Sequence, residues 1–262
     1  AVLTVLLNLI ALWKQEARDP TRTSFSHVHE TFSQSWSRLM QVPRARRFLV
    51  TIALGTAAFN MQDIILEPYG GEVLGLSVSA TTSLTALLAA GALAAFALAA
   101  RVLTRGMDPY RLAAYGTTVG LFAFAAVILA APLDAPNLFR AGTTLIGFGG
   151  GLFAVGTLTA AMNIELAGAT GLALGAWGAI QATAAGVAIA LGGAVRDIVG
   201  GLAAQGALGS TLSTSAVGYG VVYQIELLLL FMTLVAIGPL VRHRAEARVS
   251  RPTHFGLAEF PG

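Results

Sequence analysis

The chain has 262 residues, of which 55% are hydrophobic and 11% are charged, whereas soluble domains carry roughly 25% charged residues. With a mean hydropathy of +0.72, this composition predicts an integral membrane protein. Cysteine is absent, which excludes disulfides, thiolate metal sites and thiol nucleophiles. The net charge is +3, but the basic residues lie in loops between apolar stretches, so no nucleic-acid partner is predicted.

The first 13 residues are apolar but too few to cross about 30 Å of hydrocarbon, which takes about 20 residues. They lead into Trp13 and Lys14, an aromatic and a cationic residue of the kind that anchors helix ends at the membrane interface. We therefore expect residues 1–13 to be the end of a preceding transmembrane helix, and a further portion of the protein before Ala1.

A polar linker, residues 14–47, contains seven Lys or Arg residues. Within it, apolar side chains between Phe25 and Met40 recur at three- and four-residue spacing, which predicts a short amphipathic helix stopped by Pro43. Such a helix either lies flat on the membrane or docks on a partner.

Residues 48–241 contain six apolar stretches that are each long enough to cross a membrane. These are Phe48–Glu67, Val78–Ala100, Leu112–Ala131, Leu138–Met162, Gly171–Val195 and Val217–Val241. Of the 16 Lys and Arg residues, only Arg140 and Arg196 lie on the side opposite to the linker. By the positive-inside rule, the linker and the tail, residues 242–262, are cytoplasmic. The predicted fold is an all-α membrane bundle of six helices.

The most polar part of the bundle is the end of the first span. At about 100° per residue, Asn60, Asp63 and Glu67 share one helical face, while Gln62 points the other way, and Pro68 to Gly71 end the helix. Carboxylates are costly in hydrocarbon, so this face either lines the bundle interior or a wet cavity, or it lies close enough to the headgroups to stay hydrated.

Two later spans also carry polar side chains. Gln181 stacks on Trp177 at a spacing of four residues, and Glu226 follows Tyr219 and Tyr223 in the last span. No Lys or Arg lies near Glu226 within its own span, so Glu226 stays protonated, pairs across the bundle or meets water. A buried structural hydrogen bond is the simpler alternative.

Small residues predict close helix packing. The pairs Gly116 and Gly120, Gly147 and Gly151, and Gly171 and Gly175 have the four-residue spacing of such contacts. In the fifth span an almost continuous small stripe consists of Gly171, Gly175, Gly178, Ala182, Gly186 and Gly193. We interpret this stripe as a packing surface.

No chemical motif suggests an enzyme. The sequence has no nucleophile with an attached base and no metal-ligand spacing, and its glycine-rich runs lie inside apolar spans without the Lys-Ser/Thr of a phosphate loop. We predict no catalytic residues, no metal site and no intrinsic cofactor.

Six spans after a long basic linker resemble the C-terminal half of a major facilitator superfamily transporter. Three segments point to a particular family within this superfamily. They are DIILEPYGGEVLGLSVSATTSLTAL from Asp63, GAWGAIQATAAGVAIALGGAVRD from Gly175, and FGLAEFPG from Phe255. They resemble the PucC-like family of light-harvesting assembly proteins of photosynthetic bacteria. The resemblance covers nearly the whole chain and lacks the family's N-terminal half.

This resemblance implies an assembly factor in the bacterial inner, intracytoplasmic photosynthetic membrane. The implied partners are the antenna α and β polypeptides and membrane lipid, with bacteriochlorophyll synthase or the reaction-centre complex as further candidates. Bacteriochlorophyll would be bound only transiently. Antenna pigment is usually held by an intramembrane histidine, and the spans contain none, so the candidate ligands are oxygens of Asn60, Asp63, Glu67, Gln181 and Glu226.

The loop between the second and third spans carries Arg101, Arg105, Asp108 and Arg111. It occupies the place of the basic gating loop of the transporter superfamily, although we favour a plain solvated loop. The alternative function is a secondary transporter of a small solute or tetrapyrrole, with proton coupling through Asp63, Glu67 or Glu226.

Overall fold

The computed structural model describes residues 32–41, 44–163, 170–209, 212–214 and 216–249, and every regular element among them is helical. The chain divides into two compact units, residues 1–37 and 38–262, and the second contains the bundle. The expected end of a preceding helix at 1–13, most of the linker and the end of the tail lie outside the described residues. The linker helix appears as α2 (Phe32–Gln41), which ends two residues before Pro43.

The bundle consists of α3 (Ala45–Asn60), the 3-10 helix η1 (Met61–Ile64), α4 (Leu66–Glu72), α5 (Val78–Thr104), α6 (Pro109–Ala130), α7 (Pro136–Met162), α8 (Thr170–Ala204) and α9 (Ala216–Val249). Five of these helices are long and apolar enough to cross a membrane, and the bent pair around η1 makes a sixth candidate span. The predicted all-α membrane fold is confirmed. Each of the five later stretches lies on one helix, but the helices are longer: α8 runs nine residues and α9 eight residues past the predicted ends.

The first span is broken rather than continuous. Its two parts, Ala45–Ile64 and Leu66–Glu72, meet at 42°, and the break lies at η1. The prediction that Pro68 to Gly71 end the helix is wrong, because α4 runs through them to Glu72. Pro68 lies in the first turn of α4, where backbone N–H groups have no helical partner, so its missing hydrogen costs no bond.

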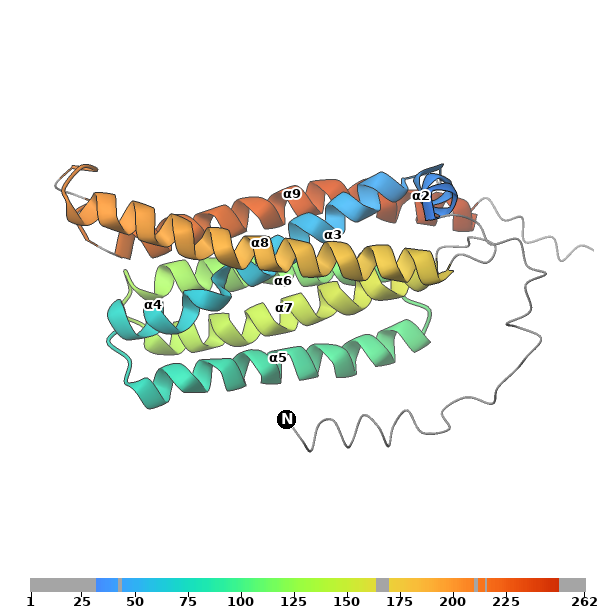
Figure 1. Cartoon of the computed structure of the whole chain (residues 1–262). Coiled ribbons are helices and arrows are strands. Elements are labelled where there is room, and N and C mark those ends of the chain that lie inside the picture. The colour runs from blue at the N-terminus through green and yellow to red at the C-terminus, as the bar shows by residue number, and fades with distance from the viewer. Residues whose placement is uncertain (1–31, 42–43, 164–169, 210–211, 215, 250–262) are drawn as a thin grey trace, which may run out of the picture. The chain divides into compact units, whose positions relative to one another are not determined.

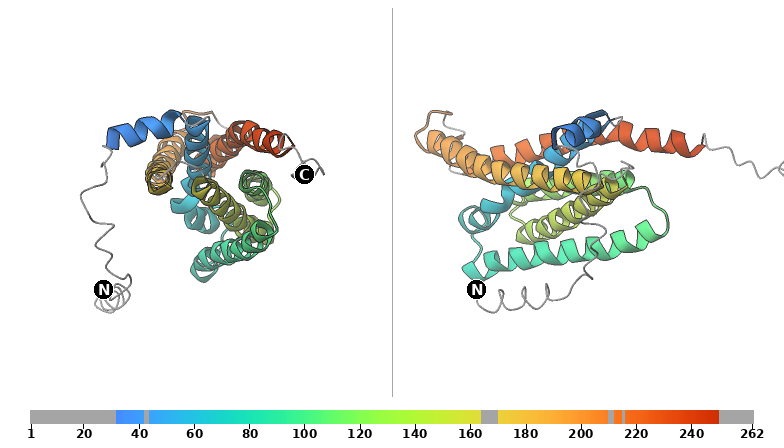
Figure 2. Two further views of the ribbon diagram at one scale, coloured as in Figure 1. Left: turned by 90° about the vertical axis from the view of Figure 1, so that its right-hand side faces the viewer. Right: turned by 45° about the vertical axis from the view of Figure 1, so that its right-hand side comes forward.

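The helices form two groups that meet in the middle of the bundle (Figures 1 and 2). In one group α7 packs along α5 and α6, and in the other α3 packs along α8 and α9, while α6 contacts α9. A chain of aromatic rings with centroids 5.1 to 6.4 Å apart connects the groups. Its members are Phe153, Phe59, Phe124, Tyr223, Tyr69 and Phe139.

Glycines allow the closest helix contacts. A Cβ atom on Gly91 would overlap the Thr144 carbonyl of α7, one on Gly147 would overlap the Leu88 carbonyl of α5, and one on Gly116 would overlap the Gly149 carbonyl. Backbones approach this closely only where a side chain is absent. The first two predicted glycine pairs therefore do lie at helix contacts.

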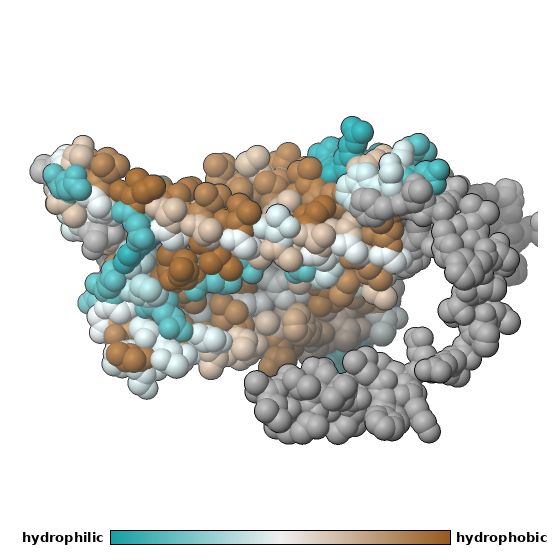
Figure 3. Space-filling view, viewed as in Figure 1, coloured by the Kyte–Doolittle hydropathy of each residue, from teal (hydrophilic) through white to brown (hydrophobic). Residues whose placement is uncertain are grey.

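The small stripe of α8 behaves differently. A Cβ atom on Gly171, Gly175, Gly178 or Gly186 would meet no atom of the described chain within 4 Å. At these four positions the stripe packs on no helix of the described chain, whereas a Cβ atom on Gly193, at the far end of the stripe, would lie 3.7 Å from Ile64. In α5 and α8 only 17% of the most apolar window is buried, compared with 56% in α7. The surface is apolar along the middle of the helices and more polar toward their ends (Figure 3).

Candidate functional site

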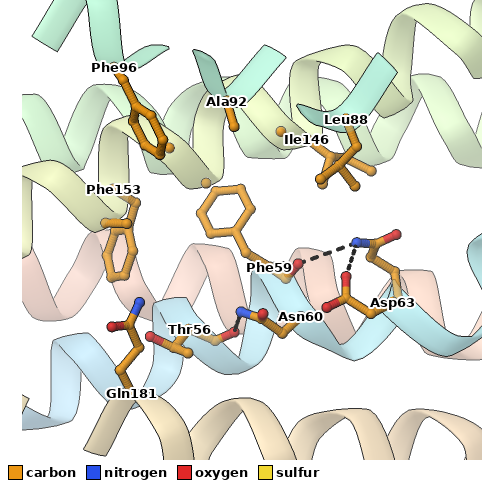
Figure 4. Close-up of a pocket in the computed structure, with 15 residues that line it drawn as sticks. Thr56, Phe59, Asn60, Asp63, Leu88, Ala92, Phe96, Ile146, Phe153 and Gln181 are labelled. Carbon is orange, nitrogen blue, oxygen red and sulfur yellow. Dashed lines mark hydrogen bonds between the residues drawn. The ribbon is translucent and has the colours of Figure 1, made fainter. Parts of the chain in front are cut away.

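A pocket of about 250 Å³ lies at the break in the first span, between α3, η1, α5, α7 and α8. We call it the central pocket (Figure 4). Its polar lining residues are Thr56, Asn60, Gln62, Asp63 and Gln181. Phenylalanine, leucine, isoleucine, alanine and glycine residues make up the rest of the wall, so a few polar groups converge in apolar surroundings.

Gln62 contributes to this pocket although the sequence placed it on the opposite face from Asp63. It is fully buried, and its Nε2 donates to the Asp63 Oδ1 at 2.6 Å and to the Phe59 carbonyl at 3.4 Å. The prediction assumed 3.6 residues per turn, but η1 winds at about three residues per turn, and this changes the direction of each side chain after Asn60. Because both partners of Nε2 are acceptors, the orientation of the amide is determined.

Glu67 does not join Asn60 and Asp63, so the predicted common face is wrong at this position. Its carboxylate accepts a hydrogen bond from the Thr85 Oγ1 at 2.7 Å, which ties α4 to α5. Asn60 lines the central pocket, where its Nδ2 donates to the Thr56 carbonyl at 2.7 Å. The amide oxygen of Asn60 therefore remains available to a bound group.

Glu226 lies behind the pocket wall on α9. Its side chain is fully buried, and it lies close enough to Asp63 for the two carboxyl groups to interact electrostatically. Within the described part of the chain, four buried side-chain atoms have no hydrogen-bond partner: Gln62 Oε1, Tyr223 OH and both Glu226 oxygens. Leaving such groups unpaired is costly, so they require a proton, a water molecule or a ligand atom.

Gln181 also reaches the central pocket from α8. One turn earlier, the Trp177 Nε1 donates to the Thr157 Oγ1 at 3.2 Å and so connects α8 to α7. The sequence did not indicate Thr157 or Thr56, because an isolated threonine in an apolar helix usually bonds to its own backbone. Thr157 does so as well, through its hydroxyl to the Phe153 carbonyl at 2.9 Å.

A second polar cluster connects α4, α8 and α9, and we call it the Arg196 network. Arg196 donates to the Glu72 carboxylate at 3.0 and 3.1 Å, to the Asp197 Oδ1 at 2.7 Å and to the Tyr219 hydroxyl. Tyr219 in turn donates to the Glu72 Oε2 at 2.8 Å. In the sequence Glu72 follows the first span and Arg196 follows the fifth, and their opposite charges at span ends are the signal from which this pairing could have been predicted.

In the loop between α5 and α6, Asp108 has a structural position. Its Oδ1 accepts hydrogen bonds from the backbone N–H groups of Tyr110 at 2.8 Å and Arg111 at 3.3 Å, so it caps the start of α6. The side chains of Arg101, Arg105 and Arg111 are exposed. The three arginines of the loop are therefore exposed, whereas its aspartate caps α6.

The candidate pigment ligands thus separate into three places. Asn60, Asp63 and Gln181 converge on the central pocket, Glu226 lies behind it, and Glu67 is bonded to α5. No group of three His, Cys, Asp or Glu residues suited to a metal ion occurs in the part of the chain that the structure describes. A pocket of this kind offers single oxygen or amide contacts rather than a preformed metal cage.

Fold and site together define a multi-pass helical membrane protein with a polar pocket at a broken span. Residues 1–245 match the family model described as PUCC protein, and the chain belongs to this family. It is 49% identical over 99% of its length to a Rhodobacter capsulatus protein described as "Uncharacterized protein in puhA-bchM intergenic region", covering 55% of that protein.

Two further relatives are named Protein PucC. The one from Rhodovulum sulfidophilum is 50% identical over 76% of this chain, which covers 44% of the relative. The one from Cereibacter sphaeroides is 45% identical over 95% of this chain, which covers 53% of the relative. The chain therefore spans about half the length of the curated relatives it matches.

Proposed function

We propose that the protein is an assembly factor for bacterial light-harvesting antenna complexes, which binds the antenna α and β polypeptides and hands over bacteriochlorophyll. Membership of the PUCC protein family supports this proposal. The observation that carries it is the open small-residue face of α8, because such a face lets another transmembrane helix approach closely. We propose that the antenna polypeptides bind at this face of α8. Bacteriochlorophyll synthase and the reaction-centre complex are further proposed partners in the membrane.

The proposed architecture is one half of a major facilitator superfamily bundle in the inner photosynthetic membrane, with the linker and the C-terminus in the cytoplasm. The size of the central pocket supports the proposal that this chain forms one half of a larger bundle. At about 250 Å³ it is smaller than the roughly 300–1,000 Å³ of typical ligand pockets, so it would hold one edge of a tetrapyrrole rather than the whole ring. A partner or the other half would supply the opposite wall.

Oxygen and amide groups suit a transient contact with the pigment. Magnesium accepts oxygen ligands, and Asn60, Asp63 and Gln181 place such groups in the central pocket. A single ligand of this kind exchanges more readily than the histidine of a mature antenna, and this favours transfer over storage.

Co-purification from pigmented membranes tests the assembly function. In the full-length protein, Gly178→Leu and Gly186→Leu would fill the open face of α8, and we expect loss of the antenna polypeptides. The matched controls are Gly220→Leu and Gly238→Leu in α9, where a Cβ atom also meets nothing within 4 Å. Retention of antenna polypeptides by the α8 variants would contradict the proposal.

The buried carboxyl group of Glu226 favours a second candidate, a proton-coupled carrier of a small solute or tetrapyrrole. A carboxyl group that lacks a hydrogen-bond partner beside a pocket is suited to carry a proton. Reconstitution of the full-length protein into proteoliposomes tests this, because a carrier gives saturable, pH-dependent uptake that Glu226→Gln abolishes. The assembly function predicts no such uptake.

A further inference from the structure

An apolar groove of about 580 Å³ lies on the surface of the bundle, where the start of α3 crosses the second half of α9. We call it the α3–α9 groove. It is lined by Arg46, Arg47, Val50, Leu54, Phe231, Met232, Val235 and Ala236. From Arg46 to Leu54 the helix rises by about 12 Å, so the groove extends from the basic end of the span well into the hydrocarbon layer.

Apart from Arg46 and Arg47, the side chains that line the groove are apolar, and several of them are largely exposed. Val50 is 52% exposed, Phe231 59% and Val235 60%. In a membrane these side chains meet acyl chains or the surface of another protein, and the groove between them needs an occupant of matching shape.

Arg47 is fixed at the mouth of the groove by a proline in the neighbouring helix. Pro239 has no N–H, so the Val235 carbonyl lacks its usual partner four residues later. The Arg47 Nη2 donates to that carbonyl at 3.1 Å, and its Nε donates to the Ala236 carbonyl at 2.7 Å. These bonds use two of the five donors of the guanidinium group and leave its charge uncompensated.

Arg46 adds a second cation at the same end. Its side chain is exposed, and neither Arg46 nor Arg47 forms an ion pair with an acidic residue among the residues that the structure describes. The positive-inside rule assigns this end to the cytoplasmic leaflet, where the anionic lipids of a membrane attract basic residues. Two guanidinium groups above an apolar channel are complementary to one phosphate group above one acyl chain.

The chemistry of the groove favours a lipid over a protein helix. Two exposed cations at one end of an apolar channel match an anionic headgroup followed by an acyl chain, whereas an apolar transmembrane helix would leave both cations without a partner. We propose that the α3–α9 groove binds one anionic phospholipid, with its phosphate on Arg46 and Arg47 and one acyl chain along Val50, Leu54 and Phe231. This site is separate from the central pocket and from the open face of α8, and it does not depend on the assembly function.

Lipid titration of the delipidated full-length protein tests the proposal, with bound lipid counted by native mass spectrometry. We expect one phosphatidylglycerol molecule to bind, and phosphatidylcholine with the same acyl chains to bind at least tenfold more weakly. Arg46→Gln should weaken phosphatidylglycerol binding by about tenfold through loss of a charge-assisted contact. Val235→Trp should weaken it similarly by filling the groove while both cations remain.

The control is Arg105→Gln, which removes an exposed cation from the same side of the membrane outside the groove and should leave binding unchanged. Equal binding of the two lipids, equal loss in the Arg105 variant, or full binding by the Val235→Trp variant would each overturn the proposal. Competition by inorganic phosphate at the same concentration as lipid would also overturn it, because the headgroup alone would then account for binding. Occupation of the groove by a co-purified polypeptide instead of lipid would do so as well.

Discussion

The bundle contains two polar clusters that use the same helix in different ways. Tyr219 of α9 belongs to the Arg196 network, in which every charged group has a partner. Tyr223 and Glu226, one and two turns further along the same face, are fully buried and have no hydrogen-bond partner within the described residues. The contrast separates a cluster whose polar groups bond to one another across three helices from one whose buried polar atoms lack partners among the described residues.

The difference follows from the donors available to each cluster. In the Arg196 network a guanidinium group and a phenol supply enough N–H and O–H groups for two carboxylates. Around Glu226 the Gln62 amide has already given its Nε2 to Asp63 and Phe59, so its remaining oxygen adds another acceptor. Hydrogen-bond acceptors therefore outnumber donors at the broken span. The missing donors must come from a proton, a water molecule or a ligand.

The largest expected effect is that of Glu226→Leu. Replacing an unpartnered buried carboxyl group by an apolar side chain of similar size should raise the free energy of unfolding by about 1–3 kcal/mol. Assembly of antenna complexes, measured from the absorption spectrum of the membranes, should nevertheless fall sharply because the polar cluster is lost. Unfolding in mild detergent measures the stability, and a destabilised variant would show that the carboxyl group is structurally bonded after all.

Arg196→Leu should have the opposite sign. It leaves Glu72 without its cation and should lower the free energy of unfolding by about 1 kcal/mol, a modest amount because the side chains of Arg196 and Glu72 are 30% and 51% exposed. At a temperature where the variant is folded, antenna assembly should be unchanged. The same unfolding and absorption measurements apply, and loss of assembly in a fully folded Arg196→Leu protein would place this network in the functional site.

The smallest effect is expected from Thr85→Val, which removes the hydrogen bond to Glu67. Because this bond lies at an exposed position, the free energy of unfolding should change by about 0.5 kcal/mol or less, and pigment binding should not change.

Asp63→Asn in the central pocket is the comparison for Thr85→Val. It keeps an acceptor for Gln62 but removes the charge, so the amount of pigment recovered with the protein should change. Equal pigment recovery in the two variants would argue against the central pocket.

Local sequence patterns were sufficient to predict many features of this protein. Apolar length and charge asymmetry determined the membrane class, the all-α fold, the five unbroken spans and the polar character of the first and last ones, because crossing hydrocarbon requires these features of each segment by itself. The sequence segments that begin at Asp63 and Gly175 likewise identified the family.

Tertiary structure alone decided which polar groups meet. The 3-10 turn at η1 brought Gln62 beside Asp63 and sent Glu67 to Thr85, and periodicity could not predict this because it assumes one regular helix. The contacts of Glu72 with Arg196 and Tyr219 join residues 124 and 147 positions apart. Such pairs depend on how whole helices pack, as does the openness of the α8 stripe, and neither is encoded in the spacing of any one segment.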